Sequence, residues 1–395
     1  MGGAGGGASS SQRQRVMVAA LLLPMLSLHA LPNAPPGATM SAVHVVGHCT
    51  AAQRFSCVGS TTSAQIPAPA AGQILIKVAG SSVNPCDSDT VRGKPGCPLN
   101  AAGIPGGDVA GTVVKCPGCT RLKVGDTVWA NRFGLAGGMA EFAVATELQT
   151  GLAPRNLALA DAGTVPIVGG TSLQCLRCLE RASTRTPVAA ATALDDRAAN
   201  PCPESSTKRP LENMTVVITS GSGGTGYLAI QMARALGATK VITAASGTAA
   251  ISWMKSLGAT TVCDLRLLLV PLLLLLLQGV HAQVSDYKNV DVFAGLPDDS
   301  VDAVFDNYAG NGTADRAMPK LRAGGAYLLL PDGDSTAGLS KHPKAGVRQI
   351  NFGDVDQTHH RTLDEIAAMF EAGTRCPPPP SHCLRRRDAA LERPL

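Results

Sequence analysis

The chain has 395 residues, of which 45% are hydrophobic and 43 are glycine, and its formal net charge is only +5. This length and composition predict a globular protein with a substantial core and more than one domain. The basic residues are scattered apart from the arginine run at 385–387, which argues against a nucleic-acid-binding groove. Twelve cysteines in so long a chain are too few for a disulfide scaffold, and we interpret most of them as reduced, small, buried residues.

Residues 1–39 have the composition of a leader rather than of a folded domain. They are rich in glycine and serine, they carry Arg13 and Arg15, and no acidic residue precedes Asp87. This composition favours an organelle transit peptide, for a mitochondrion or a plastid, while the apolar run after the two arginines also fits a secretory signal. As a further alternative, translation starts at Met40 and the protein is cytoplasmic.

After the leader, MSAVHVV at 40–46 predicts a first strand. Asp108 and Asp126 each stand beside a glycine, and we assign both to turns because this pairing suits turn geometry. Two C-x-x-C pairs follow, and neither has the strand-to-helix setting of a thioredoxin-like motif. We therefore interpret all four cysteines as ordinary loop residues. They are Cys116, Cys119, Cys175 and Cys178.

Two segments interrupt the pattern of the second half. The first, 177–212, is polar and contains prolines without a hydrophobic period, and it predicts an exposed loop. The second, 265–285, has an apolar core at 267–277 that contains Pro271 and is shorter than the roughly 20 residues of a membrane span. It is an extra buried helix, an aggregation-prone patch or the product of a faulty exon prediction, and we favour the last.

The most informative stretch is VVITSGSGGTGYLAIQMARALGA at 216–238, in which a buried strand runs into a glycine-rich loop and then into an amphipathic helix. The loop has the spacing G-x-G-x-x-G, and between a strand and a helix this pattern predicts a dinucleotide site. The first glycine permits the tight turn, the second lets a pyrophosphate approach, and the third packs the helix on the strand. The predicted cofactor-binding residues here are Gly221, Ser222, Gly223, Gly224, Thr225 and Gly226.

The choice of dinucleotide depends on a missing acid. An NAD-binding unit normally has an acidic residue at the end of its second strand, but no Asp or Glu occurs between Asn213 and Cys263. Without that carboxylate nothing repels a 2′-phosphate, which Ser246, Thr248 and Lys240 would receive. NADPH is therefore favoured over NADH.

Further along, SVDAVFDNYAGNG at 300–312 predicts another buried strand that ends in a loop at 307–310. Ligands of parallel sheets lie beyond the carboxyl ends of the strands, so we expect this loop, with Asn307, to face the nicotinamide. Tyr308 is a candidate proton donor, although a tyrosine at a strand end is more often a packing residue.

Six motifs follow one another along the chain. They are GQILIKVAGSSVNPCDSDTVRG, IPGGDVAGTV, RLKVGDTVW, GGMAEF, VPIVGGTSLQCL and the glycine loop. In order and spacing they resemble the medium-chain dehydrogenase/reductase superfamily, and more narrowly its zinc-free quinone oxidoreductase and enoyl reductase branch. The resemblance implies an α/β fold. A GroES-like β-barrel catalytic domain at 40–170 precedes a Rossmann doubly wound parallel sheet at 171–376, with inserts at 177–212 and 265–285. The active site is expected between the two domains.

The end of the chain departs from the resemblance. After a late helix in DEIAAMFEAG, relatives continue into strands that return to the catalytic domain, whereas residues 377–395 read as a disordered tail. We expect this difference to leave one edge of the barrel uncovered.

The resemblance also bears on zinc, because a catalytic zinc needs three Cys, His or carboxylate ligands. In the alcohol dehydrogenase branch, the first ligand is a cysteine where this chain has Asn84, and the second is a histidine where it has Gly107. Cys86 lies two positions from the first ligand and is better interpreted as a packed small residue. We predict no metal.

Without zinc, the expected chemistry is hydride transfer from NADPH to a quinone or an α,β-unsaturated carbonyl. By resemblance, Asn84 and Asp87 line the substrate side, Thr171 lies near the nicotinamide, and Tyr287 approaches the adenosine phosphate. Asn84 would donate a hydrogen bond to the developing oxyanion, while Asp87 is equally well interpreted as a structural cap. The alternative function is a dinucleotide-binding sensor or interaction protein without turnover. The expected partners are a small quinone or enone and a second copy in a homodimer, with no nucleic acid and no membrane span.

Overall fold

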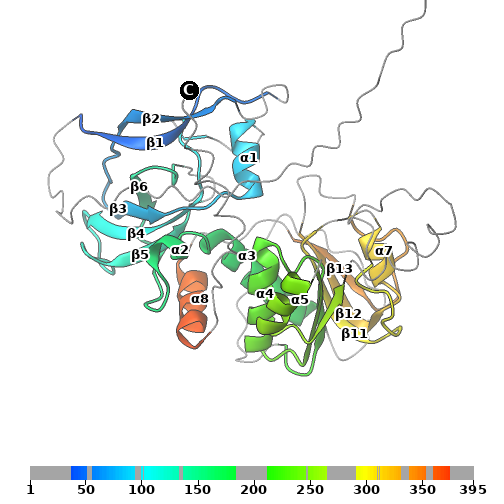
Figure 1. Cartoon of the computed structure of the whole chain (residues 1–395). Coiled ribbons are helices and arrows are strands. Elements are labelled where there is room, and N and C mark those ends of the chain that lie inside the picture. Colours follow the sequence, from blue (N-terminus) through cyan, green and yellow to red (C-terminus); the bar gives the residue numbers. More distant parts are fainter. Residues whose placement is uncertain are drawn as a thin grey trace, which may run out of the picture.

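The structure, a computed structural model, describes twelve stretches of the chain (Figure 1). Most of the leader, the segment 265–285 and the tail after residue 373 lie outside these stretches, as do Ser246 and Tyr287. The described residues are 37–50, 56–93, 99–100, 102–132, 137–183, 211–245, 248–264, 291–308, 310, 312–330, 338–352 and 359–373.

The first half of the chain forms two antiparallel sheets. The smaller pairs β1 (Thr39–Val45) with β2 (Val58–Gln65), which confirms the predicted first strand, and the larger has the order β6-β3-β4-β5-β7. A bridge between Ala42 and Ala140 connects the two sheets. The strands of the larger sheet are β3 (Gln73–Gly80), β4 (Asp108–Lys115), β5 (Thr127–Asn131), β6 (Phe142–Thr146) and β7 (Thr150–Leu152). Two short helices, α1 (Pro85–Val91) and α2 (Leu159–Ala162), follow β3 and β7.

Alternation along the strands divides the side chains of the larger sheet between two cores. Val128 and Ala130 of β5 pack with Val109 and Val113 of β4 inside the curled sheet. The residue between them, Trp129, points to the opposite face and joins the core of the second half of the chain. The antiparallel sheet therefore shares a core with the other half.

The second half of the chain forms a parallel sheet of six strands in the order β10-β9-β8-β11-β12-β13. Numbered within this half, the order is 3-2-1-4-5-6, which is the order of a dinucleotide-binding sheet. The predicted fold class, a GroES-like curled antiparallel sheet with a Rossmann sheet, is confirmed. The strands are β8 (Thr215–Ile218), β9 (Lys240–Ala245), β10 (Thr261–Asp264), β11 (Val301–Asp306), β12 (Leu321–Leu329) and β13 (Arg348–Asn351), and the helices of this half include α4 (Gly224–Ala235), α5 (Thr248–Ser256), α7 (Thr313–Ala317) and α8 (Arg361–Glu371).

Helix α3 (Pro166–Ala182) belongs to both halves. It packs against α4, α8, β11 and β12 of the parallel half and against β4 and β5 of the antiparallel half. Its last residues correct a prediction, because 177–182 were expected in an exposed loop. Leu176, Leu179 and Ala182 recur every three residues and are buried, so they continue the apolar face of the helix. The polar composition further along 177–212 concealed this short period.

Helix α8 brings the chain back to the antiparallel half. The ring of Phe370 lies edge-on to Trp129 of β5, with a centroid separation of 6.3 Å. The Asn156 side chain donates from Nδ2 to the carbonyl oxygen of Phe370 at 2.6 Å. At the start of the helix, the amide of His360 donates to the Leu148 carbonyl at 2.7 Å. The two halves are therefore connected at both ends of α8.

The expectation that most cysteines are reduced is wrong for five of the residues that the structure describes. Disulfides join Cys49 to Cys57 and Cys116 to Cys119, and Cys178 is also disulfide-bonded. Among the described cysteines, Cys86 and Cys175 are not disulfide-bonded. A C-x-x-C turn brings its two cysteines close enough for a bond without any thioredoxin-like setting, and the sequence argument had not allowed for this.

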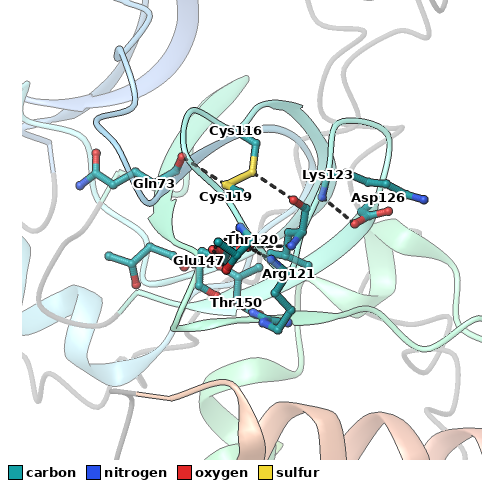
Figure 2. The surroundings of a disulfide bond; sticks show 11 residues. Gln73, Cys116, Cys119, Thr120, Arg121, Lys123, Asp126, Glu147 and Thr150 are labelled. Atoms are coloured by element: carbon teal, nitrogen blue, oxygen red, sulfur yellow. Dashed lines mark hydrogen bonds between the residues drawn. A yellow bond between two sulfur atoms is a disulfide. The ribbon is translucent and has the colours of Figure 1, made fainter.

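The loop that carries the Cys116–Cys119 disulfide lies against the β6–β7 turn (Figure 2). The Glu147 carboxylate accepts hydrogen bonds from the amides of Thr120, Arg121 and Leu122, at 2.5–3.1 Å. Each sulfur also lies near a carbonyl oxygen, that of Leu122 or Gln73. Since a disulfide sulfur carries no proton, these are contacts rather than hydrogen bonds.

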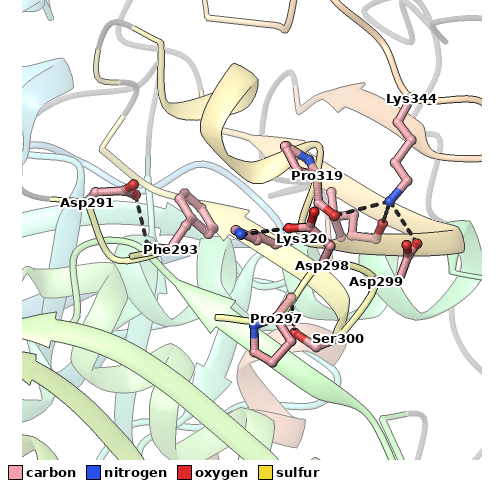
Figure 3. Close-up of polar contacts among 10 residues, drawn as sticks. Asp291, Phe293, Pro297, Asp298, Asp299, Ser300, Pro319, Lys320 and Lys344 are labelled. Atoms are coloured by element: carbon pink, nitrogen blue, oxygen red, sulfur yellow. Dashed lines mark hydrogen bonds and ion pairs between the residues drawn. The ribbon is translucent and has the colours of Figure 1, made fainter. Parts of the chain in front are cut away.

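Charged groups organise the beginnings of β11 and β12 (Figure 3). The ammonium of Lys344 donates to Asp299 Oδ1 at 2.7 Å and to the carbonyl oxygens of Pro319 and Leu321. Asp299 has a positive φ of 57°, which a short polar side chain tolerates. A second pair, Lys320 with Asp298 at 2.7 Å, lies beside it.

Candidate active site

The glycine loop follows β8 at the point where the strand order reverses, and its three motif glycines meet different surroundings. A Cβ on Gly226 would lie 1.8 Å from the carbonyl oxygen of Ser220, and a Cβ on Gly221 would lie 2.2 Å from Thr243 Oγ1. Both positions therefore exclude a side chain because helix and strands approach closely. A Cβ on Gly223 would meet only its neighbour Ser220, at 3.3 Å or more. The second glycine is thus the least crowded of the three, and the contact there is with a side-chain hydroxyl that can shift.

The loop ends at the N-terminus of α4, with Gly223 as its N-cap. The first amides of a helix have no intrahelical acceptor, and the helix dipole favours an anion at this end. The first amide that donates back into the turn is that of Tyr227, to the Gly223 carbonyl at 3.0 Å. The amides of Gly224, Thr225 and Gly226 precede it, so the residues present fit the phosphates of a dinucleotide.

Asn307, predicted to face the nicotinamide, connects the β11 loop to the glycine loop. Its Oδ1 accepts from the Ser220 amide at 2.9 Å, and its Nδ2 donates to the Ser220 carbonyl at 3.2 Å and to Thr225 Oγ1 at 3.0 Å. The polar atoms of this side chain are thus used to hold the glycine loop in place.

The neighbouring Asp306 is a fully buried carboxylate that sequence reasoning missed. Its Oδ1 accepts from Thr219 Oγ1 at 2.8 Å and from the Tyr308 amide at 3.1 Å, and its Oδ2 accepts from Tyr327 at 2.5 Å. Burial, followed by the nearby Asp306 charge, raises the pKa of the Tyr327 hydroxyl above its ordinary value. The tyrosine therefore stays protonated as the donor to Asp306.

A second polar centre lies in the antiparallel half around Asp108, which corrects the assignment of this residue to a turn. Gly106 and Gly107 provide the bend, and Asp108 is the first residue of β4 and fully buried. Its Oδ2 accepts from Ser82 Oγ at 2.5 Å and from Asn84 Nδ2 at 2.9 Å. Its Oδ1 accepts from the Ile167 amide at 2.8 Å. By contrast, Asp126 occupies a turn as predicted, with its carboxylate accepting from the Lys123 amide.

Asn84 and Asp87, the two candidate catalytic residues of this half, hold the N-terminus of α1. Asn84 is the N-cap, and its backbone amide donates to Asp87 Oδ2 at 2.7 Å. Asp87 Oδ1 also accepts from the Gly106 amide at 3.2 Å, so this carboxylate acts as a structural cap. The Asn84 side chain donates from Nδ2 to both Ser82 Oγ, at 2.8 Å, and Asp108 Oδ2. Both protons of the Asn84 side-chain amide are therefore donated to protein groups.

Burial has the largest effect on the pKa values of Asp87 and Asp108. Desolvation raises the pKa of Asp108 to about 7, even though hydrogen bonds from Ser82, Asn84 and Ile167 favour the charged form. Desolvation also raises the pKa of Asp87 against the backbone hydrogen bonds that it accepts. Near neutral pH the Asp108 carboxyl group can therefore hold or release a proton.

Helix α3 connects the two polar centres. Its Ile167 amide binds Asp108, and the single proton of Ser172 Oγ is shared between the Thr225 carbonyl at 2.8 Å and the Val168 carbonyl at 2.6 Å. The separation of five positions between these anchors corresponds to about 7.5 Å along the helix axis. Thr171, predicted to lie near the nicotinamide, is buried in this segment. Asp108 of one half and Thr225 of the other are thus both bonded to one stretch of α3.

The remaining cofactor predictions have mixed outcomes. Tyr308 is 38% exposed just after β11, at the carboxyl edge of the sheet where it was expected. Lys240 is the first residue of β9, about 16 Å along the strand from its carboxyl end, so its predicted role at the 2′-phosphate is wrong. Thr248 begins α5 just beyond that carboxyl end. The predicted contacts through Ser246 and Tyr287 lie outside the described residues.

Within the described stretches, no cluster of three or more His, Cys, Asp or Glu side chains could hold a metal ion. The same stretches contain no helix that is long and apolar enough to cross a membrane.

Comparison with known proteins supports the same family that the motifs indicated. The model of the alcohol dehydrogenase GroES-like domain matches residues 70–155. The chloroplast envelope quinone oxidoreductase homolog of Arabidopsis thaliana is 34% identical over 205 residues, which cover 51% of this chain and 55% of that protein. The chloroplastic NADPH-dependent alkenal/one oxidoreductase of the same plant is 30% identical over 270 residues, or 65% of this chain and 55% of the relative. This chain thus spans about half the length of these curated relatives.

Among solved structures, the quinone oxidoreductase from Coxiella burnetii has a similar fold, with a TM-score of 0.60. The similarity covers 89% of this chain and 96% of the bacterial one at 20% sequence identity. At this identity the match establishes the fold alone.

Proposed function

Since the chain belongs to the medium-chain dehydrogenase/reductase superfamily, in its quinone oxidoreductase-like branch, we propose that it is an NADPH-dependent reductase of quinones or α,β-unsaturated carbonyls that works without zinc. The observation that carries the proposal is the position of the glycine loop. It lies at the switch point of a 3-2-1-4-5-6 sheet, with Gly223 the least crowded of its motif glycines and α3 leading from it to the Asp108 centre.

The glycine loop and the first turn of α4 would hold the cofactor phosphates, and Asn307 would keep that loop in its binding conformation. When bound, the nicotinamide would supply the hydride. We also propose the division into a catalytic half up to residue 170 and a cofactor-binding half after it, with α3 spanning the boundary. Thr171, at this boundary, would contact the nicotinamide end of the site.

The role of Asn84 depends on Asp108. While the Asp108 carboxylate accepts from Nδ2, Asn84 has no proton left for a substrate oxygen. A protonated Asp108 would donate to Asn84 Oδ1 instead, which turns the amide and frees Nδ2 for the oxyanion that develops on the acceptor. Asp108 would then be a positioning residue, and Asn84 the donor in contact with the substrate. The exposed Tyr308 hydroxyl is the proposed source of the final proton.

The proposal is tested by binding and by turnover. In fluorescence titrations of the full chain, NADPH should bind at least tenfold tighter than NADH, a difference of about 1.4 kcal/mol. NADPH should then be oxidised in the presence of at least one member of a panel of quinones and enones. Equal affinities for the two cofactors would refute the NADPH preference.

The alternative is a dinucleotide-binding sensor without turnover, which is favoured by the commitment of both Asn84 amide protons to protein groups. NADPH binding without oxidation by any acceptor in the panel would support this alternative.

Zinc independence is tested separately. Purified protein should contain less than one equivalent of zinc, and a chelator should leave activity unchanged. A tightly held equivalent that is lost together with activity would overturn this part of the proposal.

For cellular location, we propose a plastid, because relatives of the chain are named as chloroplastic and the leader is free of acids. A fluorescent fusion of the full chain should enter plastids, and a fusion that lacks residues 1–39 should not. A homodimer, proposed from the resemblance, should give twice the chain mass of 40.3 kDa in sedimentation.

A further inference from the structure

Arg132 is a buried cation that the proposed reaction does not use. It follows β5 directly, and its amide donates to the Gly107 carbonyl at 2.5 Å, one position beyond the pairing of Asp108 with Asn131. Continuing the alternation of β5, its side chain shares the face of Val128 and Ala130 inside the curled sheet, opposite to that of Asp108.

The guanidinium group lacks a counter-charge among the residues that the structure describes. The residue is only 6% exposed, and neither Nε nor Nη1 has a hydrogen-bond partner. Burial alone lowers the pKa of Arg132 to about 10, so the group is still a cation at neutral pH. An unpaired buried charge is strongly unfavourable, and arginine offers a planar fork of donors that suits oxyanions.

A second donor points to the same place. Asn100 Oδ1 accepts from the Ile104 amide at 2.8 Å, which fixes the orientation of the Asn100 amide. Its Nδ2 lies 2.5 Å from the position that a Cβ on Gly137 would occupy, and Arg132 Nη1 lies 3.7 Å from that position. Gly137 has a φ of +96°, which favours glycine, and the absence of a Cβ lets the Asn100 side chain approach this closely.

We propose that Arg132 and Asn100 form a seat for a small oxyanion, a carboxylate or a phosphate, beside Gly137. The guanidinium supplies the charge and the Asn100 amide supplies a second hydrogen bond, and the missing Cβ of Gly137 lets these two donors lie close to each other. The seat is separate from the glycine loop, and the inference does not depend on turnover.

Thermal unfolding of the full chain tests the seat. Inorganic phosphate or acetate should raise the Tm of the wild type above a sodium chloride control of equal ionic strength. The increase should be roughly 2–4 °C at ten times the Kd. Arg132→Met should lose this response and, in buffer without oxyanions, should be at least as stable as the wild type. The matched control Arg322→Met breaks the ion pair with Asp302, so it should lower the Tm and keep the anion response.

Asn100→Asp is the complementary variant, because it places a carboxylate beside Arg132. It should raise the Tm without added anion and abolish the anion response. The proposal is overturned if the wild type responds no more to phosphate and acetate than to chloride, or if the response persists in both Arg132→Met and Asn100→Asp. If Arg132→Met does not fold, Arg132→Gln provides the same comparison.

Binding measurements with NADPH and NADH identify which molecule carries the oxyanion. Weaker binding of NADPH but unchanged binding of NADH in Arg132→Met would identify the 2′-phosphate of the cofactor as the oxyanion. Unchanged affinity for both cofactors, with the anion response lost, would assign the seat to a carboxylate or phosphate on another small molecule.

Discussion

At the scale of single residues, the three motif glycines separate folding from cofactor binding. Gly226→Ala should destabilise the fold by more than about 3 kcal/mol, because its Cβ would lie 1.8 Å from a backbone oxygen that cannot move aside cheaply. Gly223→Ala should change the unfolding free energy by no more than about 1 kcal/mol and weaken NADPH binding at least tenfold. The reason is that its Cβ would meet little of the protein and would occupy the side on which the cofactor is proposed to bind. Urea unfolding and fluorescence titration measure the two effects. Equal losses of stability in both variants would contradict this division.

Asp108 should make stability depend on pH. A folded-state pKa of about 7, above the ordinary 3.8, means that the folded chain binds more protons than the unfolded chain between these values. This contribution is fully present below about pH 4 and is lost as the pH rises to about 7, with an upper limit of about 4 kcal/mol. The isosteric Asp108→Asn variant should remove it. From pH 5 to pH 7.5 the wild type should lose stability relative to Asp108→Asn, so the unfolding free energy of the variant minus that of the wild type should increase. A constant difference would contradict the shifted pKa.

The sequence predicted site residues well where a motif constrains the backbone, and poorly where tertiary contacts determine the role of a residue. The glycine loop and the strand end at Asn307 lie where the pattern placed them, because strand, turn and helix are adjacent in the chain. Asp108 was assigned to a turn, since its partners Ser82 and Ile167 come from distant parts of the sequence. Arg132 showed no sequence signal, because only burial distinguishes it from other arginines.

At the scale of elements, Lys344 should contribute to stability through the backbone as well as through charge. It donates to two carbonyl oxygens at the start of β12 besides the Asp299 carboxylate (Figure 3). Lys344→Met should therefore cost about 1–2 kcal/mol, and most of that loss should persist in 0.5 M salt. Lys320→Met, which removes only the exposed pair with Asp298, should cost less than Lys344→Met and should be more sensitive to salt. Equal losses in the two variants would show that the carbonyl contacts contribute little.

Elements were predictable to the extent that their pattern is local. The parallel strands are short apolar runs, such as the largely buried TVVI of β8. Composition alone therefore identifies these runs as strands. The continuation of α3 through 177–182 was missed because its apolar period is interrupted by charged residues. The Cys116–Cys119 bond was missed because C-x-x-C spacing alone does not distinguish a disulfide from two free thiols.

At the scale of the whole molecule, the shared core predicts that the two halves unfold together. The chain has two tryptophans, Trp129 in the antiparallel half and Trp253 in α5 of the parallel half. Single-tryptophan variants should therefore report coincident urea transitions for both halves. Phe370→Ala, which removes the contact of α8 with Trp129, should lower both midpoints together and cost about 3–5 kcal/mol.

The matched control for this experiment is Leu152→Ala, at a side chain that is 51% exposed on β7, and it should change the stability by less than about 0.5 kcal/mol. A shift of only one transition by Phe370→Ala would show that the halves are thermodynamically independent.

Because α3 binds Asp108 with its first turn and Thr225 with its second, the two halves can swing apart as hinged jaws only if one of these hydrogen bonds breaks or the helix bends. While both bonds persist, the two halves move as one unit rather than as the closing domains of a hinged enzyme. Substrates would then enter and leave through local movements of loops, and turnover would depend little on solvent viscosity. The distance between cofactor and acceptor would be set by the rigidity of one helix rather than by a closure step.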